Sequence, residues 1–296
     1  MTLESLGSMK EIYISDLDDT LLDRHAVLPE YSKTLLNALM KEGLCFTVAS
    51  ARSPFSALPI LKGLEIQYPL ILLNGSLLYH PGKEVILETT HLPEVSVARL
   101  IEASEKYSPH TLMVTEENDR IVMQYLREDE EYWESLVDYT YFEEKKGFST
   151  KILFSEEDYN KASTLYALFS FDEPAPFEEC STFLRNDKNI TVDAYKDRYL
   201  ENRWYIEIFS YAASKQYGIQ RLQKFCSFDR CIAFGDGRND LSMFRQCDEG
   251  IAVSNACDDL KDEASEIIGS NLENAVVNYI QKRFKKDNKA EEINTK

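Results

Sequence analysis

Five short runs of apolar residues along this chain each end at a polar residue. The runs do not alternate with polar residues, and continuous apolar runs are typical of strands buried on both faces of a parallel sheet. Helical patterns separate the runs, for example over residues 29–42, after Ser214, and over residues 272–280. The alternation predicts an α/β fold in which helices cover a parallel sheet. The five runs are residues 12–14, 45–49, 70–73, 231–234 and 251–253.

The middle of the chain, from residue 91 to residue 204, has a different pattern. It is rich in Glu and Tyr and contains short alternating segments, such as residues 120–126 and 151–154, which predict strands of an antiparallel sheet. We expect two helices among these strands, at residues 95–107 and 157–169. The segment therefore predicts an α+β domain.

The parallel-sheet pattern resumes near Ile206, so one domain is expected to be split by another. We predict a Rossmann-like parallel-sheet core formed by residues 1–88 and 205–296, with an inserted α+β domain at residues 89–204. A chain of 296 residues is long enough for two such domains.

Charge and composition limit the expected partners. The chain has 51 acidic and 33 basic residues, and its formal charge of −18 repels nucleic acid and anionic membranes. No stretch approaches the ~18 apolar residues of a membrane span, and we see no signal peptide at the N-terminus. Six cysteines without a C-x-x-C pair predict reduced thiols, and four scattered histidines show no zinc pattern. We therefore expect a cytoplasmic protein whose oligomeric state the sequence does not indicate.

Polar side chains at the ends of the predicted strands are the candidates for chemistry. Ligands of open parallel sheets bind beyond the carboxyl ends of the strands, so Asp16, Ser50, Asn74 and Asp236 are expected to converge. Asp16 and Asp18 lie just past the first strand, and two carboxylates at this spacing can serve one metal and one reacting group. Taken alone, the pair also fits a helix N-cap or a solvated turn.

Two further segments can bind phosphate, although each also has a structural explanation. Ser50 precedes the backbone amides of a helix start, which can bind a phosphoryl oxygen, but a Ser there also fits a plain N-cap. Lys215 is a cation in the first turn of a helix, which costs from a few tenths of a kcal/mol to ~1 kcal/mol. A bound phosphate and nearby carboxylates would offset this cost, whereas the alternative is a Lys that faces solvent.

Residues 235–240, Gly-Asp-Gly-Arg-Asn-Asp, are the most specific single signal. The glycines permit a tight turn between a strand and a helix, and Asp236 and Asp240 bring two carboxylates to the same edge. A purely structural turn seldom needs two Gly, two Asp and one Asn in six residues. Because four such segments follow strands in a fixed order, we interpret them as one site.

With these segments the chain resembles the haloacid dehalogenase superfamily, and within it the Cof-type phosphatases, which carry a large C2-type cap domain. The resemblance covers both core segments, while the inserted domain matches the cap in position and size only. Asn74-Gly75-Ser76 resembles the Asn-Gly-Ala segment of the Cof branch. Glu207, within Ile206-Glu207-Ile208, lies in a segment that resembles the strand that re-enters the core. The four family motifs correspond to residues 16–20, Ser50, Ser214-Lys215 and residues 235–240.

Two positions depart from the family pattern. The family often has Gly where this chain has Asp19, although a second Asp is a common variant. The second motif is usually Thr-Gly-Arg, whereas this chain has Ser50-Ala51-Arg52. The hydroxyl group is kept, but Ala51 in place of Gly could narrow the approach of the backbone to a ligand.

The resemblance implies a role for each core residue. Asp16 is the expected nucleophile and Asp18 the general acid and base. Mg²⁺ is the implied cofactor, bound by the carboxylates of Asp16 and Asp236 and by the backbone carbonyl of Asp18, because Mg²⁺ prefers oxygen ligands. The remaining roles are phosphate binding by Ser50, Lys215 and Asn239, possible substrate binding by Arg52 and Asn74, and orientation of the metal ligands and Lys215 by Asp240.

The implied function is a Mg²⁺-dependent phosphatase that acts on small phosphorylated metabolites, especially sugar phosphates, through an aspartyl-phosphate. The cap would close over the site and contact the leaving group, with Arg198 and Arg203 as candidates. A sugar phosphomutase has the same motifs but returns the phosphoryl group to sugar and needs a bisphosphate activator. A dehalogenase would not need Asp18 as an acid, and a non-catalytic phosphosugar sensor could lose Asp18 freely.

Overall fold

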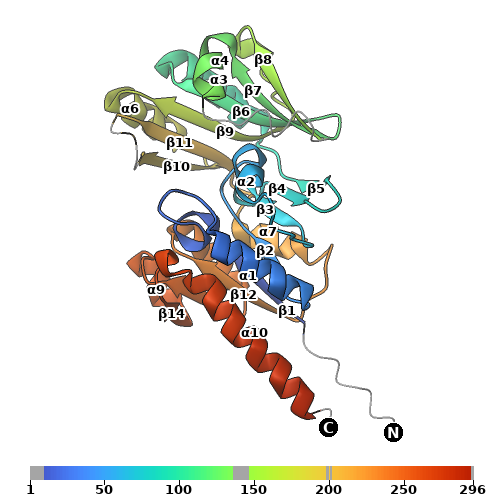
Figure 1. Ribbon diagram of the computed structural model, residues 1–296. Helices are drawn as coiled ribbons and strands as arrows, with labels where there is room; N and C mark the ends of the chain where they lie inside the picture. Colours follow the sequence, from blue (N-terminus) through green and yellow to red (C-terminus); the bar gives the residue numbers. More distant parts are fainter. Residues whose placement is uncertain (1–9, 136–146, 198–199, 201, 295–296) are drawn as a thin grey trace.

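The computed structural model describes residues 10–135, 147–197, 200 and 202–294. Its central sheet has five parallel strands in the order β14-β13-β12-β1-β2 (Figure 1). Four of the predicted apolar runs lie in these strands, so the prediction of a parallel-sheet core is confirmed. The strands are β1 (Glu11–Ser15), β2 (Cys45–Val48), β12 (Arg230–Gly235), β13 (Glu249–Val253) and β14 (Glu266–Ile268).

Helices cover this sheet, as the sequence predicted. The helices α1 (Glu30–Lys41) and α10 (Ala275–Asn294) lie next to each other across one face (Figure 1). Helix α7 (Lys215–Leu222) begins after Ser214, whose hydroxyl oxygen accepts a hydrogen bond from the backbone N–H of Tyr217. The other core helices are α2 (Pro54–Ile60), α8 (Leu241–Gln246) and α9 (Asp258–Glu263).

The predicted strand at residues 70–73 has a mixed role. Strand β3 (Leu70–Leu72) touches the parallel sheet through one bridge, between Ala49 and Ile71. It then pairs antiparallel with β4 (Leu77–His80), which pairs in turn with β5 (Val85–Thr89). This small sheet carries the chain from the core into the inserted domain.

The inserted domain, which we call the cap, contains a six-stranded sheet in the order β10-β11-β9-β6-β7-β8. Its neighbours pair antiparallel except β7 and β8, which are parallel. Among the described residues of the cap, the helices are α3 (Glu94–Tyr107), α4 (Glu130–Glu134) and α6 (Pro174–Leu184). Its strands are β6 (His110–Glu117), β7 (Arg120–Leu126), β8 (Phe148–Leu153), β9 (Thr164–Phe171), β10 (Ile190–Lys196) and β11 (Trp204–Ser210).

The prediction of a helix at residues 157–169 is wrong. Residues 164–169 of that segment belong to β9, which lies between β11 and β6 in the cap sheet. Its residues are largely apolar, and a short apolar run does not show by its periodicity whether it is a buried helix or a buried strand. The helix predicted at residues 95–107 is confirmed as α3.

The return to the core also differs from the prediction. The parallel sheet was expected to resume near Ile206, in a core segment that begins at residue 205. Instead, β11 pairs antiparallel with both β9 and β10, so Ile206 and Glu207 belong to the cap sheet. The chain leaves this sheet only after Ser210, because β10 pairs with β11 along its whole length, up to the pair of Ile190 and Ser210.

The two faces of the cap sheet belong to different hydrophobic clusters. On one face, Ile206 and Ile208 pack in a cluster with residues of α3 and α6, such as Val97. On the other face, Tyr166 and Phe209 belong to the same cluster as the core sheet. One face of the cap is therefore covered by its own helices, and the other face turns toward the core domain.

One prediction about the thiols needs correction. The structure joins Cys231, at the start of β12, to Cys247, just before β13, in a disulfide. Neighbouring parallel strands bring these two segments together, and Asp248 N–H donates to the carbonyl of Cys231. Four cysteines are free thiols, as expected. Among the helices that the structure describes, none combines the length and the apolar character that crossing a membrane requires.

Gly75 closes the connection between β3 and β4, and we expect its replacement to destabilise the core. Its φ is +95°, and a Cβ atom there would lie 2.1 Å from the backbone carbonyl oxygen of Ser214. Gly43 offers a control, because its φ is +104° but no heavy atom lies within 4 Å of an added Cβ. Backbone strain should lower the free energy of unfolding of Gly43→Ala by about 1–3 kcal/mol.

The free energy of unfolding of Gly75→Ala should fall by at least about 1 kcal/mol more than that of Gly43→Ala, because overpacking against fixed backbone adds to the strain. Urea denaturation of both variants measures the difference. Equal losses in Gly43→Ala and Gly75→Ala would show that the contact with Ser214 has no energetic weight.

Candidate active site

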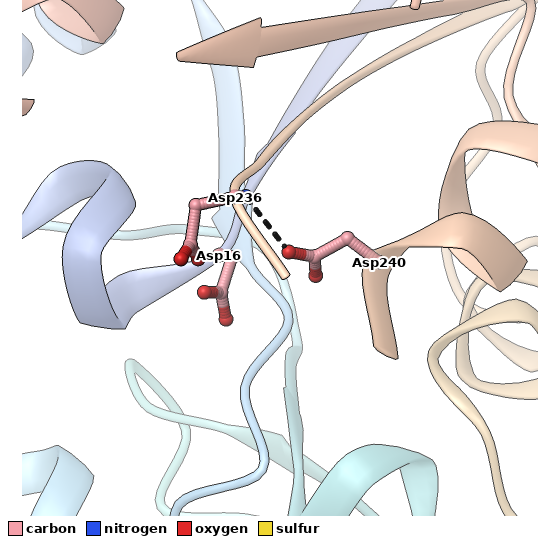
Figure 2. Close-up of side chains that lie close together, drawn as sticks. All are labelled: Asp16, Asp236 and Asp240. Carbon is pink, nitrogen blue, oxygen red and sulfur yellow. Dashed lines mark hydrogen bonds between the residues drawn. The ribbon is translucent and has the colours of Figure 1, made fainter. Parts of the chain in front are cut away.

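Two neighbouring inner strands, β1 and β12, bring the candidate carboxylates together at the edge formed by the carboxyl ends of the parallel strands. Ser15 pairs with Phe234 in the register of these strands, and the N–H of Asp16 donates to the carbonyl of Phe234 at 2.9 Å. Asp16 and Asp236 therefore leave the sheet at the same level. Figure 2 shows their carboxylates beside that of Asp240, which reaches back from the start of the next helix. The structure thus confirms that these distant residues converge.

Asp16, Asp236 and Asp240 form a carboxylate trio. Each offers an oxygen atom, and these atoms all lie within 4.8 Å of one another. The Nζ of Lys215 donates to Oδ1 of Asp16 and to Oδ1 of Asp240, at 2.5 Å in both cases. Lys215 is completely buried, so the alternative of a Lys that faces solvent is excluded.

Asp240 also fixes the loop that carries Asp236. Its second oxygen, Oδ2, accepts hydrogen bonds from the backbone N–H groups of Asp236 and Gly237, at 3.0 Å each. Gly235 is needed because a Cβ atom there would lie 2.5 Å from that same oxygen. Asp240 therefore binds both Lys215 and the loop that carries Asp236, and each of its two oxygens already accepts a hydrogen bond.

The charge of the trio exceeds that of its one buried cation. Burial raises the pKa of Asp16, and the charges of Asp240 and Asp236 add to the rise, although Lys215 opposes it. Burial also raises the pKa of Asp236 to about 7, with Asp240 as the next cause. For Lys215, burial disfavours the charge, but attraction to Asp16 and Asp240 outweighs burial and raises its pKa. Three carboxylates around one ammonium group favour a further cation.

Asp18 points to a different partner. Its two carboxylate oxygens accept bonds from Nε and Nη2 of Arg52, at 2.7 Å each. The intervening turn explains the divergence: Asp18 has extended backbone, and Asp19 has a φ of 52°. That left-handed angle also explains why Gly is common at this position in the family, since Gly adopts it without strain. The side chain of Asp18 is thus separated from the trio, which leaves its backbone carbonyl as its possible metal ligand.

The second motif lies beside this pair. Ser50 is buried at the end of β2, and its hydroxyl oxygen accepts a hydrogen bond from the N–H of Arg52 at 3.2 Å. The backbone at Ala51 has no positive φ, so Ala can replace the usual Gly without backbone strain. Asn74 donates its backbone N–H to the carbonyl of Ser50, and its side chain is 8% exposed. Among the described residues, no hydrogen-bond partner contacts Oδ1 of Asn74.

Asn239 and Arg203, two further candidates, have protein neighbours of their own in the structure. Asn239 lies half-buried in the loop of Asp236, and its Oδ1 is near Gly237. In the cap, Arg203 pairs with Asp172 at 2.6 Å and stacks on the ring of Tyr132, which gives it a structural role. Arg198 lies outside the described residues.

Two residues that the sequence analysis did not select also hold the site. The hydroxyl of Thr20 donates to Oδ1 of Asp236 at 3.2 Å, and Nδ2 of Asn255 donates to the carbonyl of Asp19 at 2.7 Å. Both tie the loop after β1 to the loops after β12 and β13. Asn255 follows a predicted strand, as the selected residues do, so its position in the sequence could have marked it as a residue of the site.

Comparison with known proteins identifies relatives along nearly the whole chain. The sequence model of haloacid dehalogenase-like hydrolases matches residues 13–280. The chain is 24% identical to the 5-amino-6-(5-phospho-D-ribitylamino)uracil phosphatase YitU of Bacillus subtilis, over 91% of this chain and 96% of the relative. It is 23% identical to the pyridoxal phosphate phosphatase YbhA of Escherichia coli, over 90% and 95%. A haloacid dehalogenase-like hydrolase from Bacteroides thetaiotaomicron has the same fold, with a TM-score of 0.71, 20% identity, and coverage of 92% of this chain and 99% of the other.

Proposed function

Since this chain belongs to the haloacid dehalogenase-like hydrolase family and is a phosphatase, we propose that it hydrolyses phosphomonoesters with Mg²⁺ and with Asp16 as the nucleophile. One observation carries this proposal: the buried Lys215 holds Asp16 at the sheet edge, next to Asp236 and Asp240. An exposed acidic turn would not keep a buried cation between two carboxylates.

The carboxylates fit a magnesium ion. Mg²⁺ takes oxygen ligands, and the trio offers only oxygen atoms. Asp16 and Asp236 are the carboxylate ligands that we propose, together with the backbone carbonyl of Asp18, because both oxygens of Asp240 already accept hydrogen bonds. When bound, the ion would neutralise the trio and polarise a phosphoryl oxygen.

Asp16 attacks phosphorus in the first step that we propose. A bond forms between a carboxylate oxygen of Asp16 and phosphorus, and the bond between phosphorus and the alcohol oxygen breaks. Asp18 gives a proton to the departing alcohol. It then takes a proton from a water whose oxygen bonds to phosphorus, while the bond between phosphorus and Asp16 breaks and inorganic phosphate leaves. Asp18 is suited to this role because its carboxylate lies outside the trio, on the side of Arg52.

The phosphoryl oxygens would be bound by the hydroxyl of Ser50 and by Lys215, with Asn239 beside them. Asn74 would contact the substrate, and its buried Oδ1 is available for a hydrogen bond. The substrates that we propose are small phosphorylated metabolites, especially sugar phosphates. The two phosphatases compared above support this class, because each is named for a small phosphorylated metabolite.

A phosphatase screen over a panel of metabolites tests the proposal. Phosphate release should be fast with Mg²⁺ and should fall at least about tenfold when a chelator removes the metal, because the carboxylates then repel the substrate. Added Mg²⁺ should restore the rate. Full turnover in metal-free buffer would contradict the role of the trio, and a need for a bisphosphate activator would indicate a phosphomutase.

A further inference from the structure

The cap presents a carboxylate to the active site that the proposed reaction does not use. Glu207 lies on β11, opposite Asp193 of β10. Its neighbours Ile206 and Ile208 are buried in the cluster of α3 and α6. Because side chains alternate along a strand, Glu207 points from the opposite face, which turns toward the core domain.

Electrostatic coupling places Glu207 near the catalytic loops. Burial disfavours the charge on Arg52, but hydrogen bonds with Asp18 and the nearby charges, including Glu207, raise its pKa. The charge of Asp18 in turn contributes to a raised pKa at Glu207. Figure 1 shows β10 and β11 above the loop that follows β1. Glu207 is therefore on the side of the site where Asp18 would meet the leaving group.

The partners of Glu207 are hydroxyl groups. The hydroxyl of Tyr195 donates to its Oε1 at 3.0 Å, and Tyr166 also interacts with it. Among the described residues, no Lys, Arg or His lies within ion-pair distance of Glu207, and the guanidinium of Arg52 is already bound to Asp18. Burial raises the pKa of Glu207 to about 7, and Asp193 adds to the rise while both tyrosines oppose it. A half-buried carboxylate whose partners are hydroxyl groups has room for further hydrogen-bond donors but repels anions.

We propose that Glu207 and Tyr195 form the subsite for the leaving group and select an uncharged polyol. This proposal rests on the phosphatase function proposed above. A polyol hydroxyl can donate to Glu207, and another can accept from or donate to Tyr195. Leaving groups that carry a carboxylate or a second phosphate meet the charges of Glu207 and Asp193. Arg185 interacts with Asp193, but no Lys, Arg or His of the described residues lies within ion-pair distance of Glu207, and Asp18 binds the guanidinium of Arg52.

Steady-state kinetics of two variants and a control test the subsite. Glu207→Gln keeps the shape of the side chain and removes its charge, and Tyr195→Phe removes one hydroxyl from a partly exposed ring. Glu102→Gln is the matched control, because Glu102 is an exposed residue of α3, on the far side of the cap sheet. The substrates are sorbitol phosphate, phosphoglycerate, a hexose bisphosphate and p-nitrophenyl phosphate, whose leaving group makes the fewest polar contacts.

For sorbitol phosphate, we expect Glu207→Gln to lower kcat/KM about ten- to hundredfold, as for the loss of a hydrogen bond to a charged group. Tyr195→Phe should lower it less, and the control should not change it. In Glu207→Gln, kcat/KM for p-nitrophenyl phosphate should change little. The ratio of kcat/KM for phosphoglycerate to kcat/KM for sorbitol phosphate should rise. These changes in selectivity distinguish contact with the leaving group from support of the fold.

Other results would overturn the proposal. An equal loss of kcat/KM on sorbitol phosphate and p-nitrophenyl phosphate in Glu207→Gln would indicate that Glu207 has only a structural role. No loss on either substrate would show that Glu207 does not contact the leaving group. A wild-type enzyme that prefers phosphoglycerate or the bisphosphate would contradict the subsite but leave the phosphatase function intact. A wild-type enzyme that hydrolyses none of the four with Mg²⁺ would instead refute the proposed function itself.

Discussion

The Asp16→Asn variant should be inactive on every phosphomonoester and should form no phosphoenzyme. The amide nitrogen and oxygen of Asn are poor nucleophiles, so the covalent step is lost and the rate should fall by more than about 10⁴-fold. Asp240 cannot take over the role, because its oxygens are bound to Lys215 and to two backbone N–H groups. Acid quenching during turnover, followed by measurement of protein-bound phosphate, detects the intermediate in the wild-type enzyme.

The inactive variant should still fold. Burial raises the pKa of Asp16, so the ionised carboxylate is costly at this position, and a neutral amide of the same shape removes that cost. Lys215 keeps Asp240 as a partner. The thermal unfolding midpoint of Asp16→Asn should therefore not drop below that of the wild type by more than a few degrees.

Asp19→Asn serves as the control in the same turn. Asn tolerates the φ of 52° at this position, and no catalytic role is proposed for Asp19. Its activity should stay within about threefold of the wild type, as for most surface changes. Protein-bound phosphate in Asp16→Asn, or an equal loss in Asp19→Asn, would refute Asp16 as the nucleophile.

The convergence of the core residues could be predicted from the sequence because parallel strands impose it. Four of the five apolar runs ended at a candidate residue, and a parallel sheet puts the carboxyl ends of its strands at one edge. Asp16 and Asp236 follow adjacent strands and meet for this reason alone. Lys215 and Asp240 lie at helix starts, and the cost of a cation at a helix N-terminus indicated that carboxylates or a phosphate lie near Lys215.

The cap and its contacts were harder to predict. Strand β9 is an apolar run without a clear period, and β11 was assigned to the core because its apolar residues resemble those of the parallel strands. Whether β11 pairs with β9 or with the core sheet depends on partners far away in the sequence. For the same reason, the pairing of Arg52 with Asp18 and the position of Glu207 opposite the catalytic loops were visible only in three dimensions.

The second large effect is expected from replacing Asp18, which pairs with Arg52, because Asp18 is the proposed acid for the leaving group. The two bonds to Arg52 hold the carboxylate of Asp18 apart from the trio, and we propose that it acts there on the leaving group. The loss of a general acid typically costs about 10²–10⁴-fold, and the cost shrinks when the leaving group needs no proton.

Asp18→Asn should therefore lose about 10²–10⁴-fold in kcat on an alkyl phosphate and far less on an activated aryl phosphate such as p-nitrophenyl phosphate. The variant should still bind Mg²⁺, because the carboxylate of Asp18 lies outside the trio and the variant keeps the backbone carbonyl. Both substrates are measured at saturating Mg²⁺, with transfer to Asp16 as the rate-limiting step, and Mg²⁺ binding is measured separately by calorimetry. Equal losses on the two substrates would exclude Asp18 as the acid for the leaving group. Loss of Mg²⁺ binding would instead place its carboxylate among the metal ligands, which the two bonds to Arg52 argue against.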